Sequence, residues 1–159
     1  MKRARAEART EWLQAHVAEA TRLATLLTAD PQRAPEVAED AFTAALQSAL
    51  SRRNVADALL AELVRRSRST SRIHDDDPEQ IKALRALARR QRAALVLRHH
   101  AELPDERAAV FLGCSPKAVA GLAAKGIAAL PPAARTDVRE WLDSTPSPRP
   151  ATGVVRVLR

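Results

Sequence analysis

The sequence contains no tyrosine and only two phenylalanine and two tryptophan residues among 159. Aromatic residues make up 3% of the chain, although hydrophobic residues as a whole make up 46%. The core must therefore consist mainly of leucine, valine and alanine, which suits closely packed helices and suits β-sheets poorly. The four glycines also provide little material for hairpin turns. The composition predicts an all-α protein.

Cysteine and long hydrophobic runs are also scarce. The single cysteine, Cys114, excludes an internal disulfide and is typical of a protein from a reducing cytoplasm. We expect it to be a small buried apolar group rather than a redox sensor. No run approaches the length of a membrane-spanning helix, and the basic residues 1–9 lead into no apolar segment of the signal-peptide kind. We expect a cytoplasmic protein with no membrane partner.

The residue patterns of common catalytic and metal sites are missing as well. There is no glycine-rich phosphate loop, no pair of catalytic carboxylates and no Cys–His arrangement. His99 and His100 are adjacent, so on a helix they point about a quarter turn apart and cannot share one metal as i, i+4 histidines do. In the acidic run 75–77, we expect Asp77 to cap the helix that begins at Pro78. We therefore expect no metal, no cofactor and no enzymatic activity.

Positive charge is what the chain has in excess. Lysine and arginine total 26 against 19 acidic residues, which gives a formal net charge of +7 and a pI near 10.9. Arginine supplies nearly all of this charge. Such a balance favours a polyanionic partner, either nucleic acid or an acidic protein surface.

Apolar residues recur at helical spacing along most of the chain. We expect helices over about 10–30, 35–51, 55–67, 78–88, 94–100 and 133–142. Residues 2–9 are either a charged arm or the first turns of the first helix. Phe42 and Leu46 are predicted core residues. The polar, non-periodic stretch between the third and fourth helices indicates a linker. We therefore predict two small helical bundles joined by a flexible linker, with the boundaries 1–68, 69–77 and 78–143, and then a Pro-rich tail over 144–159.

Residues 103–130 contain the most specific local pattern. One short helix ends at Gly113, a residue free to adopt the positive φ that a helix C-terminus favours. Ser115 is then placed as an N-cap, and Pro116 occupies the first position of a second helix, where its missing N–H costs nothing. This is the outline of a helix-turn-helix, whose second helix usually enters the DNA major groove. An ordinary αα-hairpin inside a core is the alternative.

The tail contains Pro146, Pro148 and Pro150, which disfavour helix and should hold the last residues of the chain away from the bundles. The apolar residues 154–158 either form a disordered end or dock into a groove on this protein or on a partner.

Two stretches together resemble a bacterial sigma factor of the extracytoplasmic-function type. Residues 20–46, ATRLATLLTADPQRAPEVAEDAFTAAL, resemble region two, with its leucine-rich helix, L-T-x-D-P turn and A-E-D-containing helix. Residues 87–130, LARRQRAALVLRHHAELPDERAAVFLGCSPKAVAGLAAKGIAAL, resemble region four, where an R-Q-R-x-x-x-x-L-R helix precedes a helix-turn-helix containing L-G-x-S. The two stretches cover about half of the chain in the family's order.

The resemblance implies core RNA polymerase and promoter DNA as partners, with an anti-sigma or other regulatory protein as a further one. Region two would dock on the β′ coiled coil and melt the −10 element, and region four would bind the β flap and read the −35 element. By position, Glu36 and Asp40 would face polymerase. Ser115, Lys117 and Lys125 would lie at the DNA-facing side of the second helix of the helix-turn-helix.

The chain departs from the family where promoters are melted and read. Residues 47–54 contain no aromatic side chain that could trap a flipped base. The groove-facing positions Ala120, Gly121, Leu122 and Ala124 lack the Arg, Lys, Asn or Gln that base readout requires. Three functions therefore remain open: a sigma-like factor that binds polymerase and promoter DNA, a sigma-derived adaptor that binds another protein, and a DNA-binding protein that contacts only phosphates.

Overall fold

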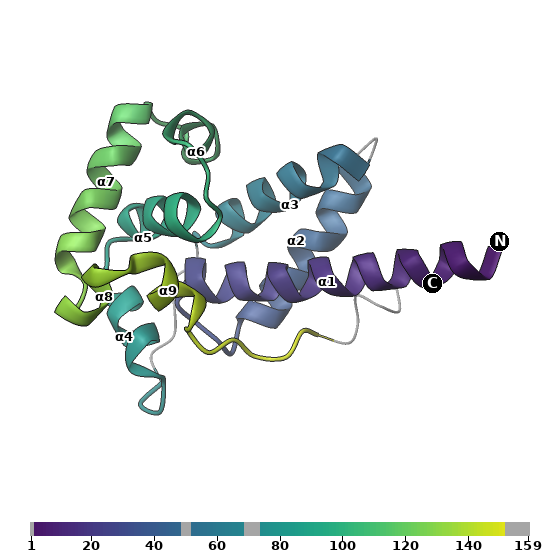
Figure 1. Ribbon diagram of the computed structural model, residues 1–159, viewed down its shortest axis with the longest axis horizontal. Coiled ribbons are helices and arrows are strands. Elements are labelled where there is room, and N and C mark those ends of the chain that lie inside the picture. Colours follow the sequence, from purple (N-terminus) through teal and green to yellow (C-terminus); the bar gives the residue numbers. More distant parts are fainter. Residues whose placement is uncertain (1, 49–51, 69–73, 152–159) are drawn as a thin grey trace.

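The computed structural model describes residues 2–48, 52–68 and 74–151, and every element in these ranges is a helix (Figure 1). The helices are α1 (Lys2–Thr28), α2 (Ala34–Ser48), α3 (Arg52–Arg66), α4 (Glu79–Ala86), α5 (Arg89–Leu95), α6 (Asp105–Leu112), α7 (Pro116–Ala129), α8 (Pro132–Thr136) and α9 (Val138–Asp143), with a π-helical segment η1 (Val96–His100) that continues α5. The described residues contain no strand, so the all-α prediction is confirmed.

Residues 2–9 are the first turns of helix α1, which is the second of the two alternatives left open by the sequence. Helix α1 ends before Pro31, as the Asp30-Pro31 pair predicts. Ala29 adopts a positive φ of 50°, and the buried Asp30 carboxylate accepts a hydrogen bond from the Arg33 backbone N–H at 3.3 Å. Figure 1 shows the N-terminal part of α1 projecting beyond the other helices, while its C-terminal part lies in the middle of the molecule.

Helices α2 and α3 pack against each other and against α1. Phe42 is only 1% exposed and is among the largest fully buried side chains of the described residues, which confirms it as a core residue. Leu46, one turn further along α2, is half-buried and packs against the edge of this core, so its predicted role is confirmed only in part.

The last predicted helix is in fact two. The sequence predicts one amphipathic helix over 133–142, but the chain breaks at Asp137, whose backbone is extended (φ −146°, ψ 91°). The Asp137 carboxylate then accepts a hydrogen bond from the Glu140 backbone N–H at 3.0 Å and caps α9. Aspartate is more favourable at an N-cap than inside a helix, which is why the break occurs at Asp137.

One hydrophobic core contains side chains from both halves of the chain. Its buried members include Leu27 of α1, Leu63 of α3, Leu84 of α4 and Leu95 of α5. Helix α1 contacts α4, α5 and η1, and α3 contacts α6. The predicted division into two bundles is therefore not confirmed, because the apolar faces of the two halves pack against each other. Of the predicted linker, residues 69–73 lie outside the described residues.

Two arginines of the second half bind the C-terminal end of α1. Arg92 is 5% exposed and donates from Nε to the carbonyl oxygen of Leu27 at 2.8 Å and from Nη1 to that of Leu84 at 3.2 Å. Arg85 donates to the carbonyl oxygen of Ala29 at 3.1 Å. The last carbonyls of a helix have no partner within it and carry partial negative charge, so a guanidinium is well suited to bind them.

Asp77 does not cap α4, contrary to the expectation from the sequence. Pro78 occupies the N-cap position and makes no side-chain cap. The Asp77 carboxylate is instead buried, where it forms an ion pair with Arg85 and accepts a hydrogen bond from the His74 backbone N–H at 3.2 Å. A buried carboxylate requires a charged partner more strongly than a helix end requires a cap, so the ion pair determines its position.

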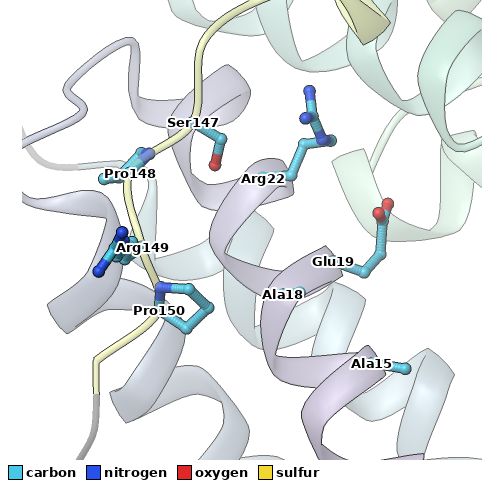
Figure 2. Close-up of a pocket in the computed structure, with 8 residues that line it drawn as sticks. All are labelled: Ala15, Ala18, Glu19, Arg22, Ser147, Pro148, Arg149 and Pro150. Carbon is cyan, nitrogen blue, oxygen red and sulfur yellow. The ribbon is translucent and has the colours of Figure 1, made fainter.

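The described part of the tail lies against α1, whereas the residues that the prolines were predicted to hold away from the bundles lie almost entirely outside the described residues. Thr145 is buried, and Arg22 of α1 donates hydrogen bonds to the carbonyl oxygens of Asp143 (2.9 Å) and Thr145 (3.1 Å). Figure 2 shows residues 147–150 running alongside α1 near Ala15, Ala18 and Glu19. The apolar residues 154–158, for which docking was an alternative, lie outside the described residues.

Candidate nucleic-acid interface

The predicted turn between two short helices is present in detail at α6 and α7. Gly113 ends α6 in the left-handed conformation (φ 65°, ψ 41°), and the Ser115 hydroxyl accepts a hydrogen bond from the Ala118 backbone N–H at 3.1 Å. Pro116 occupies the first turn of α7. The two helices meet at an angle of 91°. The left-handed Gly113, the Ser115 cap and the position of Pro116 depend on residues within one turn of the corner, which is why the sequence predicts them.

Helix α7 is held by its small inner residues. Val119, Ala123 and Gly126 are buried, and Leu130, just after the helix, is buried as well. A Cβ atom on Gly126 would lie 3.3 Å from the carbonyl oxygen of Gln91, so the absence of a side chain allows α7 to pack closely on α5. This packing fixes which face of α7 remains on the surface.

The outer face of α7 carries the three predicted DNA-contacting residues. Ser115, Lys117 and Lys125 are all exposed. The Ser115 hydroxyl is engaged as the cap, whereas Lys117 and Lys125 form no ion pair with any described residue. Gly121 and Ala124 are exposed between the lysines. This face therefore offers two cations on a small apolar surface and little hydrogen-bonding capacity for base edges.

The two predicted polymerase-facing residues lie on a different part of the molecule. Glu36 and Asp40 are exposed and one turn apart on α2, on the side opposite the buried residues Ala38 and Phe42. Neither takes part in an ion pair with a described residue. They form a small acidic surface, which the structure does not bring together with the lysines of α7.

Cys114, in the turn, is half-buried and packs against the core, so the predicted small apolar role is confirmed in part.

Sequence reasoning missed His100, which joins three helical elements. Its Nδ1 lies 2.7 Å from Oδ1 of Asp143 in α9, and its Nε2 lies 3.0 Å from Oε1 of Glu19 in α1. Burial lowers the pKa of His100, but the hydrogen bonds and the negative charges of Glu19 and Asp143 outweigh this effect and raise it. These partners are 81 and 43 residues away in sequence, so no local signal identifies them.

Arg92 was also missed as a structural residue, although its position contained a signal. Besides belonging to the R-Q-R pattern, it lies three residues before Leu95 on the buried face of α5. Burial, together with the positive charges of Arg89 and Arg85, lowers the pKa of Arg92 to about 10. An arginine on the same helix face as the core residues is expected to be buried and to need a buried hydrogen-bonding partner. Here that partner is the end of α1.

Among the described residues, no cluster of three histidine, cysteine, aspartate or glutamate side chains is suited to a metal ion. No single helix in the same ranges is long and apolar enough to cross a membrane; α6 and α7 taken together reach the necessary length and composition, but across their 91° bend. Comparison of the chain with known protein families, curated proteins and solved structures found no match.

Proposed function

We propose that this protein is a sigma-factor-like transcription regulator that contacts DNA through α7. The observation that carries the proposal is the α6–α7 corner: two helices at 91°, joined by a three-residue turn that contains Gly113, with the outer face of the second helix exposed. In helix-turn-helix proteins, this is the helix that enters the major groove. The resemblance of residues 20–46 and 87–130 to sigma regions two and four adds core RNA polymerase as a partner, with Glu36 and Asp40 as its contacts.

The chemistry of α7 supports binding that is mainly electrostatic. Lys117 and Lys125 are exposed cations that can contact phosphates, whereas Gly121 and Ala124 between them cannot read base edges. Affinity should therefore fall steeply with salt and vary little with DNA sequence.

A specific observation favours a second candidate, a sigma-derived adaptor that binds protein rather than promoter. The two halves share one core, and Arg85 and Arg92 of the second half bind the end of α1. A factor whose halves read separate promoter elements needs them to move apart, whereas an adaptor can act with this core closed.

Two measurements separate these candidates. The first is a pull-down with core polymerase, with and without promoter DNA. The second is fluorescence anisotropy with duplex DNA over a range of salt concentrations, for the wild type, Lys117→Gln and Lys125→Gln. For a DNA-binding regulator, each substitution should reduce by about one the slope of the logarithm of the binding constant against the logarithm of the salt concentration. Lys82→Gln, which removes a lysine of α4 paired with Glu79, is the matched control and should leave the slope unchanged.

Capture of polymerase together with an absence of DNA binding would assign the adaptor function. A tight complex at physiological salt that selects one short site by several orders of magnitude would contradict the electrostatic mode, because α7 lacks the side chains for it. If polymerase is not captured and DNA does not bind, the sigma-like proposal is wrong.

A further inference from the structure

A concave pocket of about 230 Å³ lies where the end of α3, the beginning of α5 and the end of α6 meet. Its floor is apolar and includes Val64, Phe111 and Leu112. Three arginines surround this floor: Arg68, Arg89 and Arg90. None of the described residues that line the pocket is acidic, so they combine an apolar surface with a concentration of positive charge.

The three arginines are not neutralised by the protein. None of them forms an ion pair with a described residue, whereas Arg65, one turn earlier, is paired with Glu62. The Nε atom of Arg89 is buried and has no hydrogen-bond partner. Burial and the positive charges of Arg68 and Arg90 lower the pKa of Arg89. Arg68 and Arg90 are exposed and Arg89 is half-buried, so an anion in the pocket would reduce the repulsion among three neighbouring like charges.

The form of the pocket indicates which anion fits. Guanidinium groups bind phosphate oxygens in pairs of parallel hydrogen bonds, and a terminal phosphate carries about two negative charges, which match several arginines better than one carboxylate does. Arg68, Arg89 and Arg90 line a concavity, which a terminal phosphate can enter. A duplex presents its backbone phosphates on a convex surface. The floor with Phe111 and Leu112 offers a place for a planar ring next to the phosphate.

We propose that this pocket binds a small organic phosphate of the nucleoside monophosphate class, with its terminal phosphate on Arg68, Arg89 and Arg90 and its ring on the apolar floor. Arg68 comes just after α3, whereas the other two arginines belong to α5, so the ligand bridges the two halves of the chain. A ligand that binds only when these halves are packed together stabilises that arrangement. The site is separate from the outer face of α7 and does not depend on DNA binding.

The test uses the full chain, with adenosine 5′-monophosphate as the probe. Isothermal titration calorimetry and thermal unfolding should show binding of one molecule and a rise in Tm. Adenosine, which lacks the phosphate, should not bind, and inorganic phosphate, which lacks the ring, should bind more weakly. Arg89→Gln should weaken binding by about tenfold or more, since it removes a charge-assisted hydrogen bond. The control Arg65→Gln removes a nearby paired arginine outside the pocket and should bind as the wild type does.

Circular dichroism establishes that each variant is folded, and Arg90→Gln replaces Arg89→Gln if the latter is not. The proposal is overturned if neither adenosine 5′-monophosphate nor inorganic phosphate binds. It is also overturned if Arg89→Gln and Arg90→Gln bind the nucleotide as tightly as the wild type. If the arginine substitutions weaken binding of duplex DNA while the nucleotide does not bind, the arginines contact a DNA backbone and the small-phosphate proposal is wrong.

Discussion

Replacing Arg85 by methionine should destabilise the protein strongly, because it leaves the Asp77 carboxylate without its charged partner. The two side chains are 14% and 6% exposed, so water can replace little of the lost interaction. The same guanidinium donates to the carbonyl oxygen of Ala29 at the end of α1. The substitution therefore removes an ion pair and one inter-helical hydrogen bond while keeping most of the apolar part of the side chain.

Removing one partner of a buried ion pair typically costs ~3–5 kcal/mol. For a chain of this length each kcal/mol lowers Tm by about 2–4 °C, so Arg85→Met should melt roughly 6–20 °C below the wild type. The double variant Arg85→Met/Asp77→Asn no longer contains the unpaired charge. Its destabilisation should fall short of the sum of the two single effects by ~1–3 kcal/mol.

The pH dependence gives this prediction a second readout. Burial raises the pKa of the Asp77 carboxyl. The hydrogen bonds from Arg85 and from the His74 backbone N–H, together with the positive charges of the Arg85 and His74 side chains, outweigh this effect and leave the pKa below 3.8. In the wild type this stabilisation is present above the unfolded pKa and is lost as the pH falls through the folded pKa. In Arg85→Met, burial without the ion pair favours the neutral carboxyl, so Asp77 becomes protonated at a higher pH than in the wild type. The difference between wild type and Arg85→Met should therefore shrink as the pH falls and be smallest below the folded pKa of the wild-type carboxyl.

Urea denaturation of the wild type, the two single variants and the double variant at pH 7 and at low pH measures these quantities. A loss of less than about 1 kcal/mol for Arg85→Met at pH 7, or strict additivity in the double variant, would show that Arg85 and Asp77 are solvated and act independently. The role assigned to Arg85 in joining the two halves would then be wrong.

Three further predictions concern the core, the hydrogen bonds of His100 and the packing of α7. Phe42→Ala should lower the free energy of unfolding by ~3–5 kcal/mol in urea denaturation, because a fully buried ring is removed; an unchanged midpoint would contradict its burial. Protonated His100 should contribute fully to the free energy of unfolding below pH 6.5, and this contribution should be lost as the pH rises through its raised pKa. Over this pH range the wild type should therefore lose stability, whereas His100→Gln should not. Gly126→Ala should destabilise the protein by ~1 kcal/mol net, since crowding against the α5 backbone exceeds the gain in helix propensity, while Gly121→Ala, with open space around it, should stabilise it by a similar amount; equal effects in thermal unfolding would refute the close approach.

The sequence by itself determined the features that depend on neighbouring residues. Apolar residues at helical spacing placed most of the helices, and Asp30-Pro31 placed the end of α1. The corner between α6 and α7 was predicted from Gly113, Ser115 and Pro116, and the structure contains the expected left-handed residue and N-cap there. These signals are reliable because backbone conformation and capping are decided by atoms within about one helical turn.

Only the tertiary structure decided which polar residues are buried and what they bind. Asp77 has the sequence position of an N-cap but is paired with Arg85, and His100 has partners from α1 and α9 that lie far away in sequence. Arg92 likewise helps to join the two halves in one core, because it donates a hydrogen bond to the carbonyl oxygen of Leu27. A buried charge is stable only where the fold supplies an opposite charge or a free hydrogen-bonding group. Because those groups come from distant segments, no local pattern contains them.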